Sequence, residues 1–276
     1  MTRTKPFFNS WIWLFLALAI ASPLPLRVAA QSPRPNNQSL PTNWGAYEPD
    51  GSIGSPGRRE GGGTRGPCIQ SSVNDRVMAL VPTNSFGTTT AEYPTFSIYL
   101  PPLSPASNPE IEFVLKTSDQ KEIYKTKFNV RQGGGIISFS LPNNSNLPAL
   151  ELNKNYSWSV TLICDPIAVA DRGDYSGNQK VEGAIRRVTP NQRVQQELKA
   201  AKSSRDRVII YAKAGIWYDA LNNLAELRRR NPNDPILIKD WSELLQSVDM
   251  EKLAKEPLFQ PVVGRNFLNS SVSRND

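Results

Sequence analysis

The chain has 276 residues, with 32 Lys or Arg, 25 Asp or Glu and no His, and its formal net charge is +7. The lack of histidine excludes Ser-His-Asp and Cys-His catalysis and zinc sites that use imidazole. Two cysteines cannot form a four-thiolate zinc site either. An enzyme would need carboxylate pairs, a Ser-Lys arrangement or an all-oxygen metal site, and none has a recognisable spacing. We therefore expect a protein that is not an enzyme and has no cofactor or metal.

Residues 1–30 have the features of a secretory signal peptide. Arg3 and Lys5 precede an apolar run over residues 11–20, and Val28-Ala29-Ala30 supplies the small side chains that a signal peptidase needs. These features predict cleavage directly after residue 30. We expect an exported protein of the periplasm or cell envelope, or one released outside the cell.

Export restricts the partners that the protein can have. Removal of residues 1–30 takes away three basic residues and no acidic one, so the mature charge is +4, too mildly basic to indicate nucleic acid as a partner. The apolar run is short for a bilayer span, so no stable membrane span is expected after cleavage; retention as an anchor is the alternative. In an oxidising compartment an even cysteine count favours a disulfide, here between Cys68 and Cys164.

Residues 31–67 are rich in Pro, Gly, Asn and Ser and show no strand or helix period. This composition predicts a mobile, disordered linker. Near its end, Arg58, Arg59 and Arg65 stand among glycines. Exposed backbone N–H groups and guanidinium groups could hold an anion or contact a partner there, although the three arginines could equally lie in water. The segment lacks the Gly-Lys-Ser/Thr ending of a phosphate-binding loop.

Residues 68–188 show short runs in which apolar and polar side chains alternate. The clearest run is over residues 156–164, where Trp158 and Cys164 fall on the core face. About seven such strands, separated by Pro, Gly and Asn turns, predict an antiparallel β-sandwich. Residues 152–156 resemble the tyrosine corner of immunoglobulin-like domains, in which Tyr156 would bond back to the upstream backbone.

Residues 189–256 have a helical period, with a predicted N-cap at Thr189 and three amphipathic helices from about residue 208 onward. The spacing of Tyr211, Ala220, Leu224 and Pro232 resembles a tetratricopeptide repeat. Because only about one and a half repeats are present, the apolar faces must pack either on the β-domain or on another protein.

The helical unit also contributes two candidate partner-binding residues. Trp217 and Trp241 are large aromatic side chains on the apolar faces of the predicted helices. They are candidates only if those faces are covered by another protein rather than by the β-domain.

Four acidic residues, Asp165, Asp171, Asp174 and Glu182, cluster in the sequence. Asp171 and Glu182 have the spacing of the first and last ligands of a calcium-binding loop, but the positions between them lack the other ligands and the turn glycine. The same carboxylates are the only candidates for a histidine-free hydrolase, which is one alternative function.

Several longer motifs together resemble a known family. They are residues 57–68, 91–96, 159–166, 212–221 and 241–245. The chain resembles the cyanobacterial exported proteins grouped as domain of unknown function 928, over roughly residues 55–258. The resemblance implies an envelope location but no activity, so no catalytic residue is carried over. Residues 257–276 are expected to form a disordered tail.

The sequence thus predicts an α+β protein in which an antiparallel immunoglobulin-like β-sandwich precedes a C-terminal tetratricopeptide-like helical unit. The leading hypothesis is a non-enzymatic protein–protein interaction or structural module whose partner is another envelope protein. The alternative from a different class is a β-sandwich module that binds an anionic envelope polymer or glycan.

Overall fold

The computed structural model describes residues 2, 40, 57–62, 68–70, 76–105, 107–130, 133–143 and 147–263. Apart from residues 2 and 40, the predicted signal peptide and the linker up to residue 56 lie outside these ranges, as do Arg65 and residues 264–276. Ser39–Asp276 belong to one compact unit, and the fold given below is the fold of that unit.

One sheet has five strands in the order β2-β8-β7-β4-β5. Their bounds are Phe86–Thr89 for β2, Gln179–Arg187 for β8, Asn155–Ile163 for β7, Glu110–Thr117 for β4 and Glu122–Asn129 for β5. The alternation predicted around Trp158 is confirmed in β7, where the apolar side chains are buried and Ser157, Ser159 and Thr161 are half-buried. The pattern in the sequence therefore identified the core face of this strand.

The other sheet has four strands in the order β1-β3-β6-β9. Their bounds are Met78–Ala79 for β1, Thr95–Leu100 for β3, Gly135–Ser140 for β6 and Val262–Val263 for β9. Among the described strands, β2 pairs with β8 and β6 with β9 in parallel, so the expectation of an antiparallel sandwich was wrong for these pairs. Parallel neighbours need a long connection, and long stretches of chain do separate the members of both pairs.

The two sheets pack face to face through aromatic side chains. The ring of Phe96 on β3 lies 5.0 Å from that of Phe113 on β4 and 5.2 Å from that of Trp158 on β7. Phe113 in turn lies 4.7 Å from Phe139 on β6. Rings from both sheets thus fill one continuous core between them.

Residues 57–62 join the two sheets at one edge. The backbone N–H of Gly61 donates to Val77 O at 2.8 Å, beside β1, while the N–H of Glu182 on β8 donates to Arg58 O at 2.9 Å. The prediction of a disordered linker was therefore wrong for this stretch. It lacks large apolar side chains, but its backbone donors and acceptors are paired with strands on both sides.

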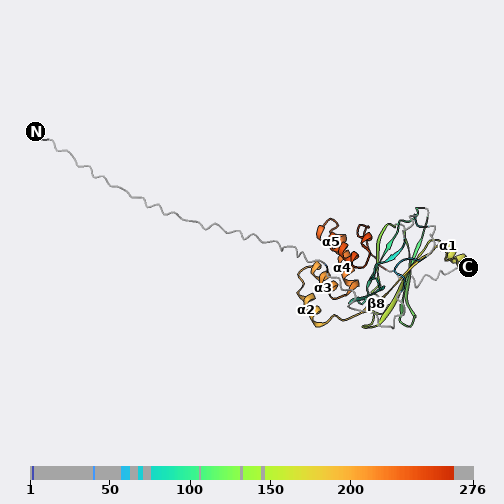
Figure 1. Cartoon of the computed structure of the whole chain (residues 1–276), viewed down its shortest axis with the longest axis horizontal. Coiled ribbons are helices and arrows are strands. Elements are labelled where there is room, and N and C mark those ends of the chain that lie inside the picture. The colour runs from blue at the N-terminus through green and yellow to red at the C-terminus, as the bar shows by residue number, and fades with distance from the viewer. Residues whose placement is uncertain are drawn as a thin grey trace. The chain divides into compact units, whose positions relative to one another are not determined.

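Helices follow the last long strand of the five-stranded sheet. The structure has α2 at Gln192–Ala200, α3 at Ser204–Lys213, α4 at Trp217–Arg230, α5 at Pro235–Gln246 and a short 3-10 helix, η3, at Glu251–Leu253. A further helix, α1 at Pro166–Arg172, lies between β7 and β8. The N-cap of α2 is Asn191, whose side chain accepts the N–H of Val194, and not the predicted Thr189. Figure 1 shows α2 to α5 together on one side of the strands.

Helix α4 packs directly on the strands and contacts β2 and β3. Trp217 Nε1 donates to Leu80 O at 3.0 Å, and Asn222 Nδ2 donates to Thr95 O at 2.8 Å. Gly87 on β2 permits this approach, because a Cβ there would lie 2.9 Å from the Tyr218 ring. Helix α4 thus buries its apolar face against the sheets, and α3 and α5 pack on α4, which decides between the two alternatives that the sequence left open. None of the described helices is long and apolar enough to cross a membrane.

The chain returns to the four-stranded sheet after the helices. The N–H of Phe259 donates to Ile136 O at 2.9 Å, and Arg229 Nε on α4 donates to Phe259 O at 2.7 Å. Residues 257–263 are therefore ordered, and the predicted disordered tail was wrong for them. The remainder of that tail, residues 264–276, lies outside the described residues.

Candidate interaction surface

The predicted partner-binding tryptophans lie in the core. Trp217 and Trp241 are each 1% exposed, so neither indole can contact a partner in this structure, and the prediction was wrong for both. The period of the helices identified an apolar face but did not reveal that the sheets and the neighbouring helices cover it.

The arginines of the glycine-rich segment have separate surroundings. The side chain of Arg59 is tied into the fold, because its Nη1 donates to Val248 O at 2.5 Å. Arg58 is exposed, and its backbone pairs with β8. Arg65 lies outside the described residues, so the predicted cluster of three cations is reduced to one exposed arginine in the part that can be described.

Three of the four carboxylates of the sequence cluster have local contacts, and Asp171 is exposed. Asp165 caps α1 by accepting the N–H of Ala168 at 2.8 Å, and Glu182 pairs with Lys180 at 2.5 Å. Asp174 accepts the N–H of Ser176, and the hydrogen bonds from that serine lower the pKa of Asp174. No three acidic, Cys or His side chains of the described residues are grouped so that they could hold a metal ion. These contacts give the carboxylates structural roles in turns and caps.

Buried polar groups hold the helical layer to the strands. Asp219 on α4 accepts hydrogen bonds from Thr89 Oγ1 at 2.7 Å and from the N–H of Thr90 at 3.0 Å. Burial raises the pKa of Asp219, and these hydrogen bonds oppose that shift. Within the helical layer, Arg205 on α3 donates hydrogen bonds to Asp240 on α5 from Nε at 2.6 Å and from Nη2 at 2.8 Å. Because these charged groups are satisfied internally, a partner must be sought on the outer surface.

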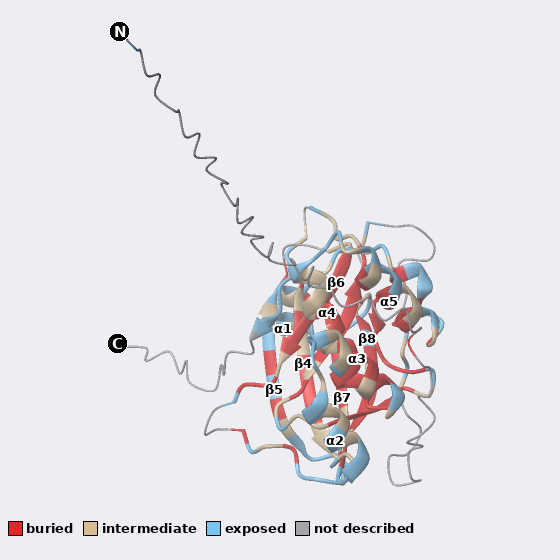
Figure 2. Cartoon of the chain, turned by 90° about the vertical axis from the view of Figure 1, so that its left-hand side faces the viewer, coloured by how far each residue is buried: buried red, intermediate tan, exposed pale blue. Residues whose placement is uncertain are grey.

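Strand β5 has an unpaired edge. It is the last strand of its sheet, and no described strand pairs with its other side (Figure 2). The N–H of Val130 donates to Pro109 O, which sets the alternation along the β4–β5 ladder. By that alternation the backbone N–H and C=O groups of Lys125, Lys127 and Asn129 point away from β4. Sequence reasoning predicted a strand here but had no signal for its place in the sheet.

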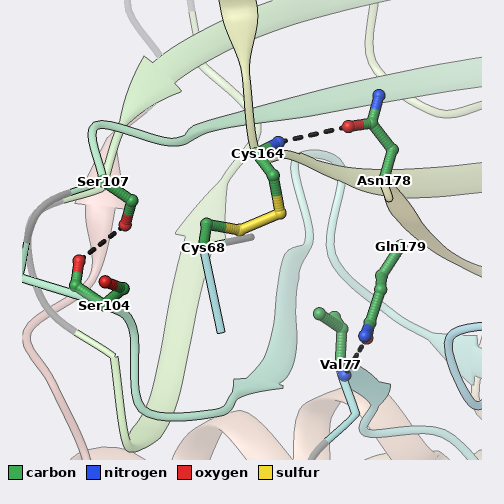
Figure 3. Close-up of a disulfide and its surroundings, with 7 residues drawn as sticks. All are labelled: Cys68, Val77, Ser104, Ser107, Cys164, Asn178 and Gln179. Atoms are coloured by element: carbon green, nitrogen blue, oxygen red, sulfur yellow. Dashed lines mark hydrogen bonds between the residues drawn. A yellow bond between two sulfur atoms is a disulfide. The ribbon is translucent and has the colours of Figure 1, made fainter. Parts of the chain in front are cut away.

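A groove follows this edge. One hollow of about 580 Å³ is lined by β5 and Glu110, and a second of about 550 Å³ shares Glu110 and Asn129 with the first. The second hollow reaches Cys164 and Ile167, an isoleucine that is 71% exposed. Figure 3 shows Ser104, Ser107 and Cys164, which line this end of the groove. We call the two hollows together the β5 groove.

The lysines beside the β5 groove are held by ion pairs that an incoming carboxylate could replace. Glu112 lies 3.1 Å from Lys125 Nζ and 3.5 Å from Lys127 Nζ, and both lysine side chains are almost half exposed. Exposed ion pairs of this kind contribute little to stability, so the lysines could turn to an incoming carboxylate at small cost.

A smaller hollow of about 180 Å³ lies on the outer face of the five-stranded sheet. Its lining includes Lys116, Ser157, Ser159, Lys180 and Glu182. Lys180 is paired with Glu182, whereas no ion pair joins Lys116 to another described residue. A lysine ammonium beside two hydroxyl groups is suited to an anion.

The fold and these surfaces define a two-sheet α+β protein with a helical layer, and the described residues present a free strand edge and shallow hollows. The chain belongs to the family described as Domain of Unknown Function (DUF928), whose model matches residues 60–258. This match confirms the family that the sequence motifs indicated. No curated protein matches the chain.

Cys68 and Cys164, at the end of the β5 groove, form the predicted disulfide, with Cα atoms 5.1 Å apart.

Proposed function

We propose that this chain is a non-enzymatic interaction module of the cell envelope that binds an extended segment of another protein along the free edge of β5. The observation that carries the proposal is the row of outward backbone groups at Lys125, Lys127 and Asn129, with the β5 groove beside it. A partner strand would satisfy those groups with backbone hydrogen bonds and place alternate side chains in the groove.

The charges favour a partner with acidic side chains over a second copy of the chain. In an antiparallel ladder, directly opposite residues have side chains on the same face. If two copies of β5 paired about the middle of the strand, Lys125 or Lys127 would face another Lys125 or Lys127, and such like-charge pairs are destabilising. A strand with Glu or Asp at alternate positions gives opposite charges at the same places.

The proposal predicts that Lys127→Pro weakens the binding of such a strand roughly tenfold, whereas Lys127→Ala weakens it about threefold or less. Proline removes the outward N–H and blocks the edge, while alanine removes only a side chain in exposed ion pairs. The probe is a synthetic peptide with alternating acidic residues, selected from a displayed library on the full chain, and affinity is measured by fluorescence anisotropy.

A second measurement does not depend on the folding of the proline variant. N-methylation of the peptide at residues whose N–H faces β5 should abolish binding, and methylation at the intervening residues should leave it intact. A library that yields no binder, or a binder indifferent both to Lys127→Pro and to the position of methylation, would contradict the proposal.

The proposal includes the finer architecture. The two sheets would form an immunoglobulin-like sandwich, supported by the N–H of Glu151, which donates to the Tyr156 hydroxyl at 3.0 Å as in a tyrosine corner. The helices α3 and α4 would form a tetratricopeptide-like pair, supported by the burial of Tyr211, Ala220 and Leu224.

A second candidate function is the binding of an acidic envelope polymer or glycan on the outer face of the five-stranded sheet, favoured by the unpaired Lys116 in its hollow. Lys116→Gln should weaken salt-sensitive binding of an oligosaccharide of uronic acids roughly threefold. Lys199→Gln, an exposed lysine on α2, is the matched control and should have no effect. Equal affinities of the two variants, or the absence of any binding, would count against this function.

A further inference from the structure

Leu40 lies far outside the family match but is part of the apolar core. It is 4% exposed and belongs to the same cluster of buried side chains as the helices. Its backbone N–H donates to Glu243 Oε2 on α5 at 3.1 Å, across a sequence separation of 203 residues. A single leucine from the segment that precedes the fold is thus held by the last long helix.

The acceptor on α5 lies beside two ion pairs. Glu243 Oε1 lies 3.6 Å from Lys239 Nζ, which leaves Oε2 for the N–H of Leu40. One turn earlier on α5, Asp240 is held by the fork of Arg205 on α3. A carboxylate that accepts a backbone N–H forms a charge-assisted hydrogen bond.

We propose that this face of α5 is a peptide-binding site for a segment that carries a leucine, and that the chain fills it with its own residue 40. The leucine side chain supplies buried apolar area, and Glu243 accepts the backbone N–H of the same residue. Because the segment belongs to the same chain, its effective concentration is in the millimolar range, so even a weak site stays occupied.

Docking of Leu40 is separate from the β5 groove and does not depend on it.

The test uses the full chain and a fluorescent synthetic peptide with the sequence of residues 36–46. Leu40→Asp should bind this peptide about tenfold more tightly than the unaltered chain, because the competing segment has left the site. Adding Glu243→Ala to Leu40→Asp should lower the affinity again by about tenfold. Leu152→Asp, the same change at a leucine that is 48% exposed, is the matched control and should behave as the unaltered chain does.

Equal peptide affinity for the unaltered chain and Leu40→Asp would overturn the proposal, as would binding that does not require Glu243. Sedimentation gives a second test. If the unaltered chain were a dimer and Leu40→Asp a monomer, Leu40 would dock on a second copy, and the proposal that the chain fills its own site would be overturned. Hydrogen exchange needs no variant: the amide of Leu40 should exchange at least about tenfold more slowly than in the free peptide, and an unprotected amide would refute docking.

Discussion

Replacing both Cys68 and Cys164 with alanine is expected to lower the free energy of unfolding by about 4 to 5 kcal/mol. The disulfide joins residues 96 apart in the sequence, and in the chain-entropy model closing a loop of that length restricts the unfolded chain strongly. Both cysteines are buried, so the bond also holds together two parts of the core.

Equilibrium urea unfolding under non-reducing conditions measures this effect. Each single variant should lose nearly as much stability as the double variant, because the bond acts as one unit. Reductant should shift the unaltered chain to the midpoint of the double variant and leave the double variant where it is. If all these proteins unfolded at one midpoint, the cross-link would contribute nothing to the folded chain.

The contacts around the disulfide indicate which part of the fold should lose most stability when the disulfide is removed. The N–H of Cys164 donates to Asn178 Oδ1 at 3.1 Å (Figure 3), and the C=O of Cys68 accepts the N–H of Ser104 at 2.7 Å. The disulfide therefore connects the end of β7, through Cys68, with the loop that lines one end of the β5 groove. Hydrogen exchange around Ser104 should rise more in the double variant than exchange in α4, which is held by other contacts.

Side-chain patterns predicted the parts of the fold in which side chains decide the structure. Alternation around Trp158 identified a strand and its buried face, and the even cysteine count, together with the expectation of export, predicted the disulfide. The helical period located α3 to α5 through positions such as Val208 and Leu224. In each case the burial of apolar side chains has a period that the sequence records.

The predictions from sequence failed where backbone hydrogen bonds or the tertiary arrangement determine the structure. Residues 57–62 and 257–263 pair through N–H and C=O groups, which every sequence possesses, so their composition gave no sign of order. Trp217 was assigned to a possible interface because an apolar face looks the same whether a sheet or a partner covers it. The free edge of β5 and the docking of Leu40 follow from strand order and from long-range contacts, which local spacing does not encode.

Trp217→Ala is expected to lower the free energy of unfolding by about 4 kcal/mol, because it removes a large side chain from the boundary between α4 and the strands. The change also leaves Leu80 O, in a fully buried residue, without the indole donor that lies 3.0 Å away. Trp217→Phe keeps most of the volume and should cost about 1 to 3 kcal/mol. Ile238→Ala, at a side chain that is 44% exposed on α5, is the control and should change stability by about 0.5 kcal/mol or less.

The same variant separates a core role from an interface role when unfolding and binding are measured together. In conditions where Trp217→Ala is still folded, it should bind the acidic strand peptide as the unaltered chain does, because the β5 edge lies on other strands. If Trp217→Ala kept its stability and lost binding, Trp217 would be an interface residue. The packing of α4 on the sheets through Trp217 would then be wrong. With the expected result, Trp217 serves to attach α4 to the sheets, and the binding surface belongs to the strand edge that the helices leave uncovered.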